Sequence, residues 1–329
     1  MSGPMTRRTH RWWASGVVAA IVVIAVGVLL ALGLNADPST PGMPLGPVTP
    51  SSTGASAPAT ATVALVVKID NVAAARPATG LGSADVIYVE PVEGGVTRLV
   101  AVYLGAPPTV IGPVRSARGT DIELLGQYGR PVLAYSGAAP ELLPALHAAN
   151  LVNASPAEAS EAFSRDPDRA APHNLYLRPH RLPDGGTAAA EPALRFGAAS
   201  ATGAPCSRHE IDFRATGFTF TWSPEAKRWL VSMDATPMTT TESGRLAAAT
   251  VIEQRVETSA AESGEDGPGP VSPVARTIGQ GRATVLRDGQ RFDVNWSRPT
   301  KSAPTQFHTE SGTAVPLAPG PVWILLLPA

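Results

Sequence analysis

One apolar run near the N-terminus constrains this chain more than any other feature. From Ala14 to Leu34, 21 residues pass without an ionisable side chain. A helix of this length covers about 30 Å, the thickness of the hydrocarbon core of a bilayer. Three arginines precede the run within residues 1–13, and clustered arginines favour the cytoplasmic side. The sequence therefore predicts a cytoplasmic N-terminus (residues 1–13), one transmembrane helix (residues 14–34) and an extracytoplasmic body.

A cleaved secretory signal has the same order of basic, apolar and small residues, and this alternative stays open. The apolar core of such a signal is shorter, about 7–15 residues. The best cut-like site, Leu34-Asn35-Ala36, has a large leucine where a small residue is needed. A lipoprotein signal needs a cysteine directly after the apolar run, whereas the single cysteine of this chain is Cys206. We therefore favour an uncleaved anchor in the cell membrane.

The composition after the anchor separates a spacer from a folded body. Residues 35–62 hold six prolines among Ser, Thr, Gly and Ala, which predicts a disordered, semi-extended linker. All 27 acidic residues but only 23 of the 26 basic ones follow the anchor, so the body carries a charge of −4. A nucleic-acid-binding protein would show a clustered basic surplus. The histidines are scattered without zinc-ligand spacing, so we expect no nucleic-acid partner, no metal and no cofactor.

The first part of the body, residues 63–185, mixes strand and helix signals. Apolar and β-branched runs predict strands, and a paired glycine between two of them predicts a hairpin. Thr120 to Glu123 has the Thr-x-x-Glu form of a capping box, which predicts the start of a helix. Interleaved strands and helices are typical of an α/β or α+β domain. The expected strands are 63–69, 85–92, 97–104 and 131–135, and the expected helices are 121–128, 140–149 and 156–163.

The second part of the body, residues 209–329, follows a junction at residues 186–208 that is rich in Ala, Gly and Thr. Its apolar residues recur with a period of two, as in Phe218, Phe220 and Trp222, which predicts strands with one buried face. Asp288-Gly289 between two such runs predicts a hairpin with a type I′ turn. A buried strand over 322–327 is expected to close a mainly antiparallel β domain.

A loop before the first predicted helix carries the clearest candidate site. It runs from Gly112 to Asp121 and contains Arg115, Ser116 and Arg118. Guanidinium groups and free N–H groups at a helix start both favour anions, so the loop suits a phosphate or a carboxylate. The alternative, which stays open, is structural: Asp121 already complements the helix dipole, and the arginines can pair with nearby acids.

Other candidate residues lie on a predicted strand and in a later loop. Glu90 and Glu93 belong to one strand and its turn, and paired carboxylates serve as general acid and base in glycoside cleavage. Acids that are solvated or paired with arginine are the structural alternative. His173 and Asn174 follow a proline, and such a histidine can orient a ligand or accept a proton. A histidine that only holds its own loop is the alternative.

Several motifs of the body resemble one known family when they are taken as a set. The most specific are Val67-Lys68-Ile69-Asp70-Asn71, Arg76-Pro77, Val92-Glu93-Gly94-Gly95-Val96-Thr97-Arg98, Gly112-Pro113-Val114-Arg115-Ser116-Ala117-Arg118 and Pro172-His173-Asn174-Leu175-Tyr176. Together they resemble the YerB-like lipoprotein family of unknown function. The resemblance implies a bacterial envelope protein with consecutive N- and C-terminal domains and no assigned activity. It also implies lipid anchoring through cysteine in many members, which this chain replaces with its predicted transmembrane helix.

We therefore expect a single-pass membrane protein whose extracytoplasmic body binds an anionic or saccharide component of the cell envelope. The expected ligand-binding residues are Arg98, Arg115, Ser116, Arg118, Glu90, Glu93, Asp121, His173 and Asn174. Two alternatives from other classes stay open. One is a cell-wall hydrolase that uses Glu90 or Glu93 as acid or base. The other is a structural protein of the envelope that binds another envelope protein.

Overall fold

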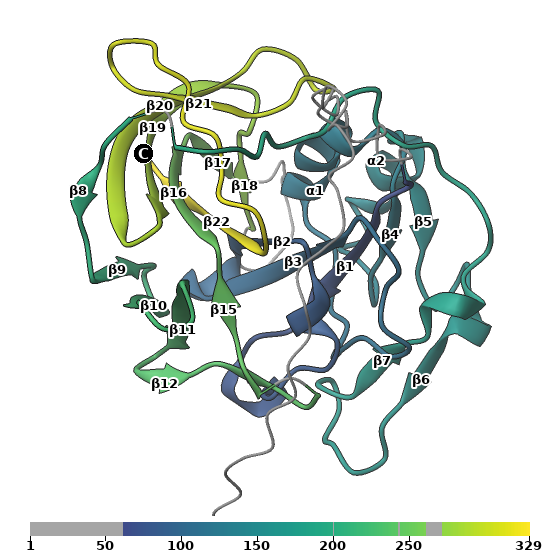
Figure 1. Cartoon of the computed structure of the whole chain (residues 1–329). Helices are drawn as coiled ribbons and strands as arrows, with labels where there is room; N and C mark the ends of the chain where they lie inside the picture. The colour runs from purple at the N-terminus through teal and green to yellow at the C-terminus, as the bar shows by residue number, and fades with distance from the viewer. Residues whose placement is uncertain (1–61, 200, 243, 261–271) are drawn as a thin grey trace, which may run out of the picture. The chain divides into compact units, whose positions relative to one another are not determined.

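The computed structural model describes residues 62–199, 201–242, 244–260 and 272–329 (Figure 1). The predicted transmembrane helix and residues 35–61 of the predicted linker lie outside these ranges. Within the described ranges, no helix has the length and apolar character needed to cross a membrane. The fold described below is that of the body alone.

The first half of the body contains short strands, 3-10 turns and two α-helices of six residues each in the described ranges. Its strands are β1 (Leu65–Ile69), β2 (Val86–Pro91), β3 (Thr97–Tyr103), β4 (Val132–Ala134), β5 (Val152–Ala154), β6 (Phe163–Arg165) and β7 (Leu175–Leu177). The helices are α1 (Gly119–Leu124), which continues into a 3-10 turn at Leu125–Tyr128, and α2 (Leu143–Ala148).

The second half of the body is built from strands joined by turns. Its strands are β8 (Ala204–Pro205), β9 (Arg208–Asp212), β10 (Gly217–Ser223), β11 (Arg228–Met233), β12 (Thr236–Pro237), β13 (Thr239–Thr240), β14 (Gly244–Arg245), β15 (Ala247–Ala248), β16 (Thr250–Val256), β17 (Thr258–Ala260), β18 (Pro273–Ala275), β19 (Gly279–Arg287), β20 (Gln290–Arg298), β21 (Gln306–His308) and β22 (Val322–Pro328). The described part of the chain is therefore β-rich, with few helices.

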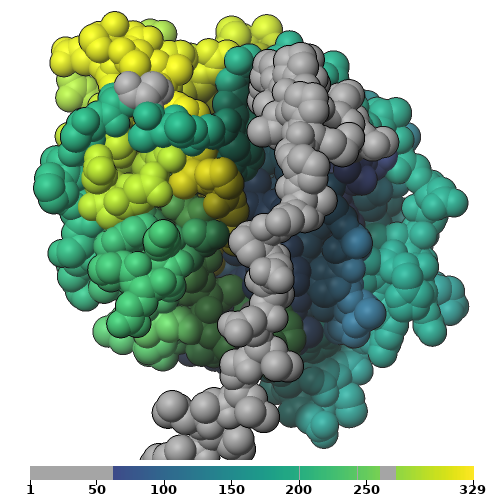
Figure 2. Space-filling view, viewed as in Figure 1, coloured from purple at the N-terminus to yellow at the C-terminus, as the bar shows by residue number. Residues whose placement is uncertain are grey.

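One mixed sheet of eleven strands runs through both halves in the order β21-β20-β19-β16-β22-β2-β3-β1-β4-β5, with β8 on β20. The halves meet where β22, the last strand, pairs in parallel with β2. Figure 2 shows the blue surface of the first half against the green and yellow surface of the second. Because backbone hydrogen bonds continue across this junction, the two halves share one sheet rather than only a side-chain interface.

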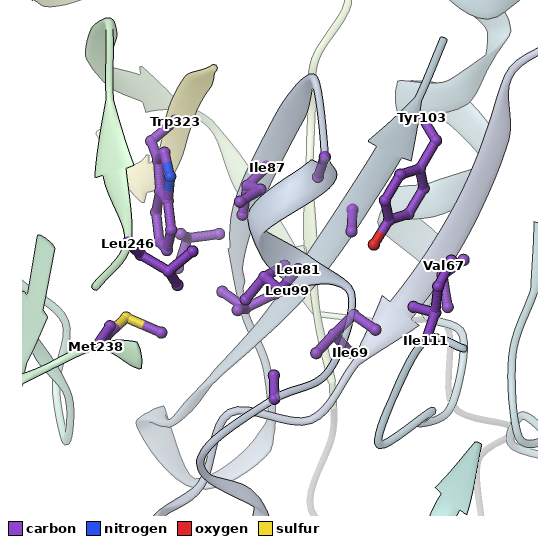
Figure 3. Packing of buried hydrophobic residues seen from close by; sticks show 14 of the residues in the cluster. Val67, Ile69, Leu81, Ile87, Leu99, Tyr103, Ile111, Met238, Leu246 and Trp323 are labelled. Atoms are coloured by element: carbon purple, nitrogen blue, oxygen red, sulfur yellow. The ribbon is translucent and has the colours of Figure 1, made fainter. Parts of the chain in front are cut away.

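Both faces of the central sheet are covered, so its strands are apolar almost throughout. Val67 and Ile69 of β1 face the same side as Ile87 of β2 and Leu99 of β3, and Figure 3 shows this packing together with Trp323 of β22. The opposite face packs against α1 and the turn that follows it, with Leu124, Leu125 and Tyr128 in the second core. Alternate residues of one strand therefore belong to different cores.

A smaller sheet, β12-β11-β10-β9 with β15 on β11, packs against the first of these faces. Phe218 and Phe220 of β10 lie with their ring centroids 6.2 and 6.1 Å from that of Trp323. Trp323 is fully buried, and aromatic pairs at this separation add to the stabilisation from burial. The period-two pattern predicted for residues 218–222 is confirmed, since Phe218 and Phe220 both point into this core.

The predicted strands of the first half are confirmed, but its helical content is lower than expected. The expected helix at residues 121–128 is one α-helical segment plus a 3-10 turn. The helix expected at 156–163 is wrong: only a 3-10 turn at Ser160–Ala162 forms there. The Ser155 hydroxyl accepts the Ala157 N–H, and the Glu158 carboxylate accepts the Ser155 N–H. These side chains offer the backbone an alternative to helical hydrogen bonds.

The predicted capping box is also wrong. The helix begins at Gly119, and the carboxylate of Asp121 accepts the backbone N–H of Arg118 at 2.7 Å. The Thr120 hydroxyl instead accepts the N–H of Ala275 at 3.0 Å, and Glu123 accepts the N–H groups of residues 277 and 278. Both side chains of the motif therefore hold the segment around β18 rather than the start of α1.

The hairpin predicted at Asp288-Gly289 is confirmed, with positive φ angles of 52° and 71° as a type I′ turn requires. A Cβ at residue 289 would lie 2.8 Å from the indole nitrogen of Trp222. We expect Gly289→Ala to lower the free energy of unfolding by about 1–2 kcal/mol, from backbone strain and this clash. Gly105→Ala is the control, because a Cβ there meets no heavy atom within 4 Å. Equal denaturation midpoints for the two variants would contradict the expectation.

Candidate functional site

Charged side chains lie along one face of three adjacent strands of the central sheet. Glu90 of β2 is opposite Arg98 of β3, and Lys68 of β1 is opposite Val100 of β3. Since side chains alternate between faces along a strand, Lys68, Glu90 and Arg98 share one face. Asp70 follows two residues after Lys68 and lies 3.2 Å from Arg98 Nη1. None of these four residues is more than 4% exposed.

Lys68 is at the buried centre of the first group of contacts. Its Nζ donates to Glu90 Oε1 and, at 2.8 Å, to Asp121 Oδ1 at the start of α1. All three side chains are fully buried. Burial and the adjacent charge of Asp121 raise the pKa of Glu90 to about 7, against the opposing effect of Lys68. Two carboxylates around one ammonium group leave an excess negative charge, which a proton on Glu90 removes.

Asp70 is the centre of the second group of contacts. Its Oδ1 accepts a hydrogen bond from Arg98, while its Oδ2 lies 3.0 Å from Arg115 Nε and 2.8 Å from His173 Nδ1. Asp70 is buried, but the side chains of Arg115 and His173 are 26% and 22% exposed. Because Nδ1 faces Asp70, the ring of His173 has Nε2 left for other contacts. A buried carboxylate thus orients two side chains that reach the surface.

Arg118 and Glu93 form the third group of contacts. Arg118 Nη2 donates to Glu93 Oε2 at 2.8 Å, with side chains 15% and 27% exposed. Burial acts to raise the pKa of Glu93, but the hydrogen bond and charge of Arg118 outweigh it, so this pKa lies below its ordinary value. Asp121 links this group to the first, since its Oδ2 accepts the N–H of Arg118. We call these nine residues the Asp70 cluster: Lys68, Asp70, Glu90, Glu93, Arg98, Arg115, Arg118, Asp121 and His173.

Seven of the nine residues predicted from the sequence therefore come together, and two do not. Ser116 contacts the hydroxyl of Ser136 at 3.4 Å. Asn174 accepts a hydrogen bond from Arg165 and donates to the carbonyls of Asp166 and Arg169. Asn174 thus holds its own loop, and a ligand-binding role for it or for Ser116 stays a prediction.

Two members of the cluster, Lys68 and Asp70, were missing from the sequence-based prediction, although a signal was present. Lys68 interrupts the apolar run at residues 63–69. A charge within a strand that is buried on both faces needs a partner. The spacing of two then places Asp70 on the same face. The partners themselves cannot be identified in this way, because Glu90 is 22 residues and Asp121 is 53 residues away from Lys68.

The accessible part of the cluster consists of Arg115, Arg118 and His173, which we call the cationic rim. Within the described residues, the Nε atoms of Arg98, Arg115 and Arg118 are buried without a hydrogen-bond partner, so the contact of Arg115 with Asp70 is an ion pair alone. Guanidinium groups recognise carboxylates and phosphates through paired N–H donors. No group of three or more His, Cys, Asp or Glu side chains in the described ranges has a metal-binding arrangement. The rim therefore places positively charged N–H donors at the surface.

The raised pKa of Glu90 leads to a pH-dependent stability. Between the ordinary value of 4.5 and about 7, the folded state keeps a proton that the unfolded state releases. The contribution of Glu90 to the free energy of unfolding is therefore complete below pH 4.5. It decreases by about 2–3 kcal/mol as the pH rises toward 7. We expect Glu90→Gln to remove this loss, while Lys68 stays paired with Asp121.

Chemical denaturation of both proteins from pH 4.5 to pH 8 measures this difference. Glu93, Glu158 and Glu253 have lowered pKa values, so their effects fall below this window and are common to both proteins. Parallel stability curves for the wild type and Glu90→Gln would contradict the expectation.

Comparison with solved structures finds the same fold in a bacterial protein. The chain matches the crystal structure of the YerB protein from Bacillus subtilis with a TM-score of 0.68 and 19% sequence identity, over 82% of this chain and 91% of that one. At this identity the match shows the fold alone. The mixed sheet and the antiparallel strands after it are therefore an architecture that this protein shares with YerB.

Comparison of sequences identifies the family. A segment of 54 residues is 41% identical to "Putative lipoprotein YerB" of Bacillus subtilis (strain 168), and it covers 16% of each protein. Residues 52–192 match the N-terminal domain and residues 209–324 the C-terminal domain of a family described as protein of unknown function, DUF3048. The resemblance expected from the motifs is confirmed. This chain, whose two halves match the N- and C-terminal domains in order, belongs to the DUF3048 family.

Proposed function

We propose that this protein is a membrane-anchored, extracytoplasmic binding protein, whose cationic rim holds an anionic component of the cell envelope. The observation that carries the proposal is the position of Arg115 and His173 over the buried Asp70. Both contact one carboxylate oxygen, so neither side chain has to be ordered when a ligand arrives. Preorganised donors bind more tightly because they lose less conformational entropy.

The charge of the cluster supports an anionic ligand. Four cationic side chains (Lys68, Arg98, Arg115 and Arg118) face four acidic ones (Asp70, Glu90, Glu93 and Asp121). Since the pKa of Glu90 is raised to about 7, it is partly protonated near neutral pH, and the cluster then carries a net positive charge. A phosphate or carboxylate at the rim balances that charge. The relation to a lipoprotein supports the envelope location.

Retention on an anionic wall polymer tests the proposal. We expect Arg115→Gln with Arg118→Gln to weaken retention of the full-length protein by about 100-fold, from two lost charge-assisted hydrogen bonds. The matched control is Arg130→Gln with Arg181→Gln, which removes the same charge from two exposed arginines. Unchanged retention of the Arg115 and Arg118 variant would reject the rim and favour a structural role in the envelope.

A wall hydrolase is the second candidate function, favoured by one observation. A carboxyl group with a pKa of about 7, as in Glu90, suits a general acid. However, Glu90 is fully buried against Lys68, and the pKa of Glu93 is lowered. Release of muropeptides by the wild type, lost in Glu93→Gln or Glu90→Gln, would select the enzyme. Absence of turnover together with rim-dependent retention would select the binding protein.

A further inference from the structure

A second group of arginines surrounds a hollow that shares no residue with the Asp70 cluster. Its volume is about 370 Å³, and its wall includes Arg165, Arg169 and Arg178. The β6–β7 hairpin and its loop provide these arginines, while Thr79 and Thr241 come from distant segments of the chain. The hollow is within the range of small-ligand sites, about 300–1,000 Å³, and exceeds what a bare inorganic anion needs.

Neutral acceptors, rather than carboxylates, hold the guanidinium groups of this hollow. Arg169 donates to the carbonyls of Ala75 and Pro77 at 3.0 and 2.9 Å. Arg165 donates to the amide oxygen of Asn174 at 2.6 Å, and Arg178 donates to the Ser164 hydroxyl. Each guanidinium has five N–H donors, so the three groups keep both their charge and unused donors.

The acids near this hollow do not neutralise it. Asp166 is in the wall, but its Oδ2 lies 3.9 Å from Arg169 Nε. Glu242 accepts the N–H of Gly80 at 2.9 Å and lies beside the Thr241 hydroxyl. Among the described residues, neither Arg165 nor Arg178 has an ion pair within 4.0 Å. Three arginines against Asp166 in the wall and Glu242 beside it leave a positive surplus, which matches an anionic phosphate monoester.

Hydroxyl groups and an aromatic ring complete the wall. The hydroxyls of Thr79 and Thr241 are 2.9 Å apart, and Ser164 lies beside Arg178. Tyr176 lies below the guanidinium of Arg169, which is 6.0 Å from the ring centroid. Hydroxyl groups both donate and accept hydrogen bonds, as the hydroxyls of a polyol require. The wall therefore offers charge for a phosphate and hydroxyl groups for an attached polyol.

The geometry points to a second ligand site in this hollow, which takes the phosphate monoester of a small polyol. Arg165 and Arg178 bind the phosphate, Arg169 keeps its place through the backbone carbonyls, and the threonine hydroxyls contact the polyol. This site is independent of the cationic rim, because no residue is common to both.

Calorimetric titration of the full-length protein with glycerol phosphate tests the site. Separate titrations with inorganic phosphate and with glycerol measure the contribution of each part of this ligand. We expect glycerol phosphate to bind about tenfold more tightly than inorganic phosphate, and glycerol not to bind. Arg165→Gln with Arg178→Gln should weaken binding by about 30-fold or more. The nearby exposed Arg181→Gln and the rim variant of Arg115 and Arg118 should leave it unchanged.

Several outcomes would overturn the site. They are absence of glycerol phosphate binding, full binding by the Arg165 and Arg178 variant, and equal losses in the Arg181 control. Equal affinity for inorganic phosphate would reject the polyol contact. If the double variant unfolds early in a thermal scan, the exposed Arg165→Gln alone decides the question. Sedimentation with phosphatidic acid vesicles, whose headgroup is a phosphate monoester, distinguishes the sources. Co-sedimentation that glycerol phosphate reduces by competition assigns the group to a lipid headgroup, and co-sedimentation that glycerol phosphate leaves unchanged assigns it to a soluble ester.

Discussion

Replacing Lys68 by methionine is expected to lower the free energy of unfolding by about 3–5 kcal/mol. Methionine fills a similar volume, so the loss comes from charge rather than from packing. Glu90 and Asp121 would remain fully buried without their shared cation. Two carboxylates at close range in a dry environment repel each other, and at least one must take up a proton. Urea denaturation at pH 7 measures the change.

Two further variants separate this effect from a general effect of losing a lysine. Lys227→Met removes the same charge from an exposed turn and should change the stability by less than about 0.5 kcal/mol. Adding Glu90→Gln and Asp121→Asn to Lys68→Met should recover most of the loss, because a buried group without charges has no ion to desolvate. A stable Lys68→Met protein, or a triple variant no more stable than the single one, would contradict the proposed origin of the loss.

Asp70→Asn is expected to have a comparable effect on stability, about 3–5 kcal/mol, and a second effect on ligand retention. Asparagine has nearly the shape of aspartate but no charge. The buried guanidinium of Arg98 would lose its counter-ion. Arg115 and His173 would lose the carboxylate that orients them. Retention on the anionic polymer should therefore fall even at temperatures where the variant is folded.

The control for this variant is Asp168→Asn, which changes an exposed aspartate near the same loop as His173. Its stability and its retention should both stay at the wild-type level. The two readouts are made on the same preparation, by denaturation and by retention. An Asp70→Asn protein that is destabilised but retained as strongly as the wild type would show that the rim does not depend on Asp70. Wild-type stability would show that Arg98 does not depend on this counter-ion.

Features of this chain that depend on neighbouring residues could be predicted from the sequence, whereas features that depend on residues far apart in the chain could not. The hairpin at Asp288-Gly289 could be predicted because two adjacent residues set its backbone angles. The strand β22 could be predicted from an uninterrupted apolar run. Helices were overestimated at residues 156–163, where local hydrogen bonds of Ser155 compete with the helix. The domain boundary at residues 186–208 stays a prediction, because β2 and β22, which lie on either side of it in the chain, pair within one sheet.

The candidate site shows the same limit for charged residues. Arginines and acids bounded by glycine and proline were sufficient to select most of the cluster. The sequence did not predict which acid each arginine contacts: Arg115 contacts Asp70, and Arg118 contacts Glu93. It also did not decide whether these arginines serve structural pairing or ligand binding. A single lysine in a strand gives no indication of its partners, so the sequence does not select Lys68 as a site residue.

The sequence by itself determined the features that depend on neighbouring residues: where strands run, where tight turns fall, and which short motifs assign the chain to its family. Only the tertiary structure decided that the last strand joins the first half, and that Asp70 and Lys68 each gather charges from segments far apart in the chain. The physical reason is that the energy of a buried charge depends on the groups within a few ångströms of it, and the fold, rather than the order of residues, brings those groups there.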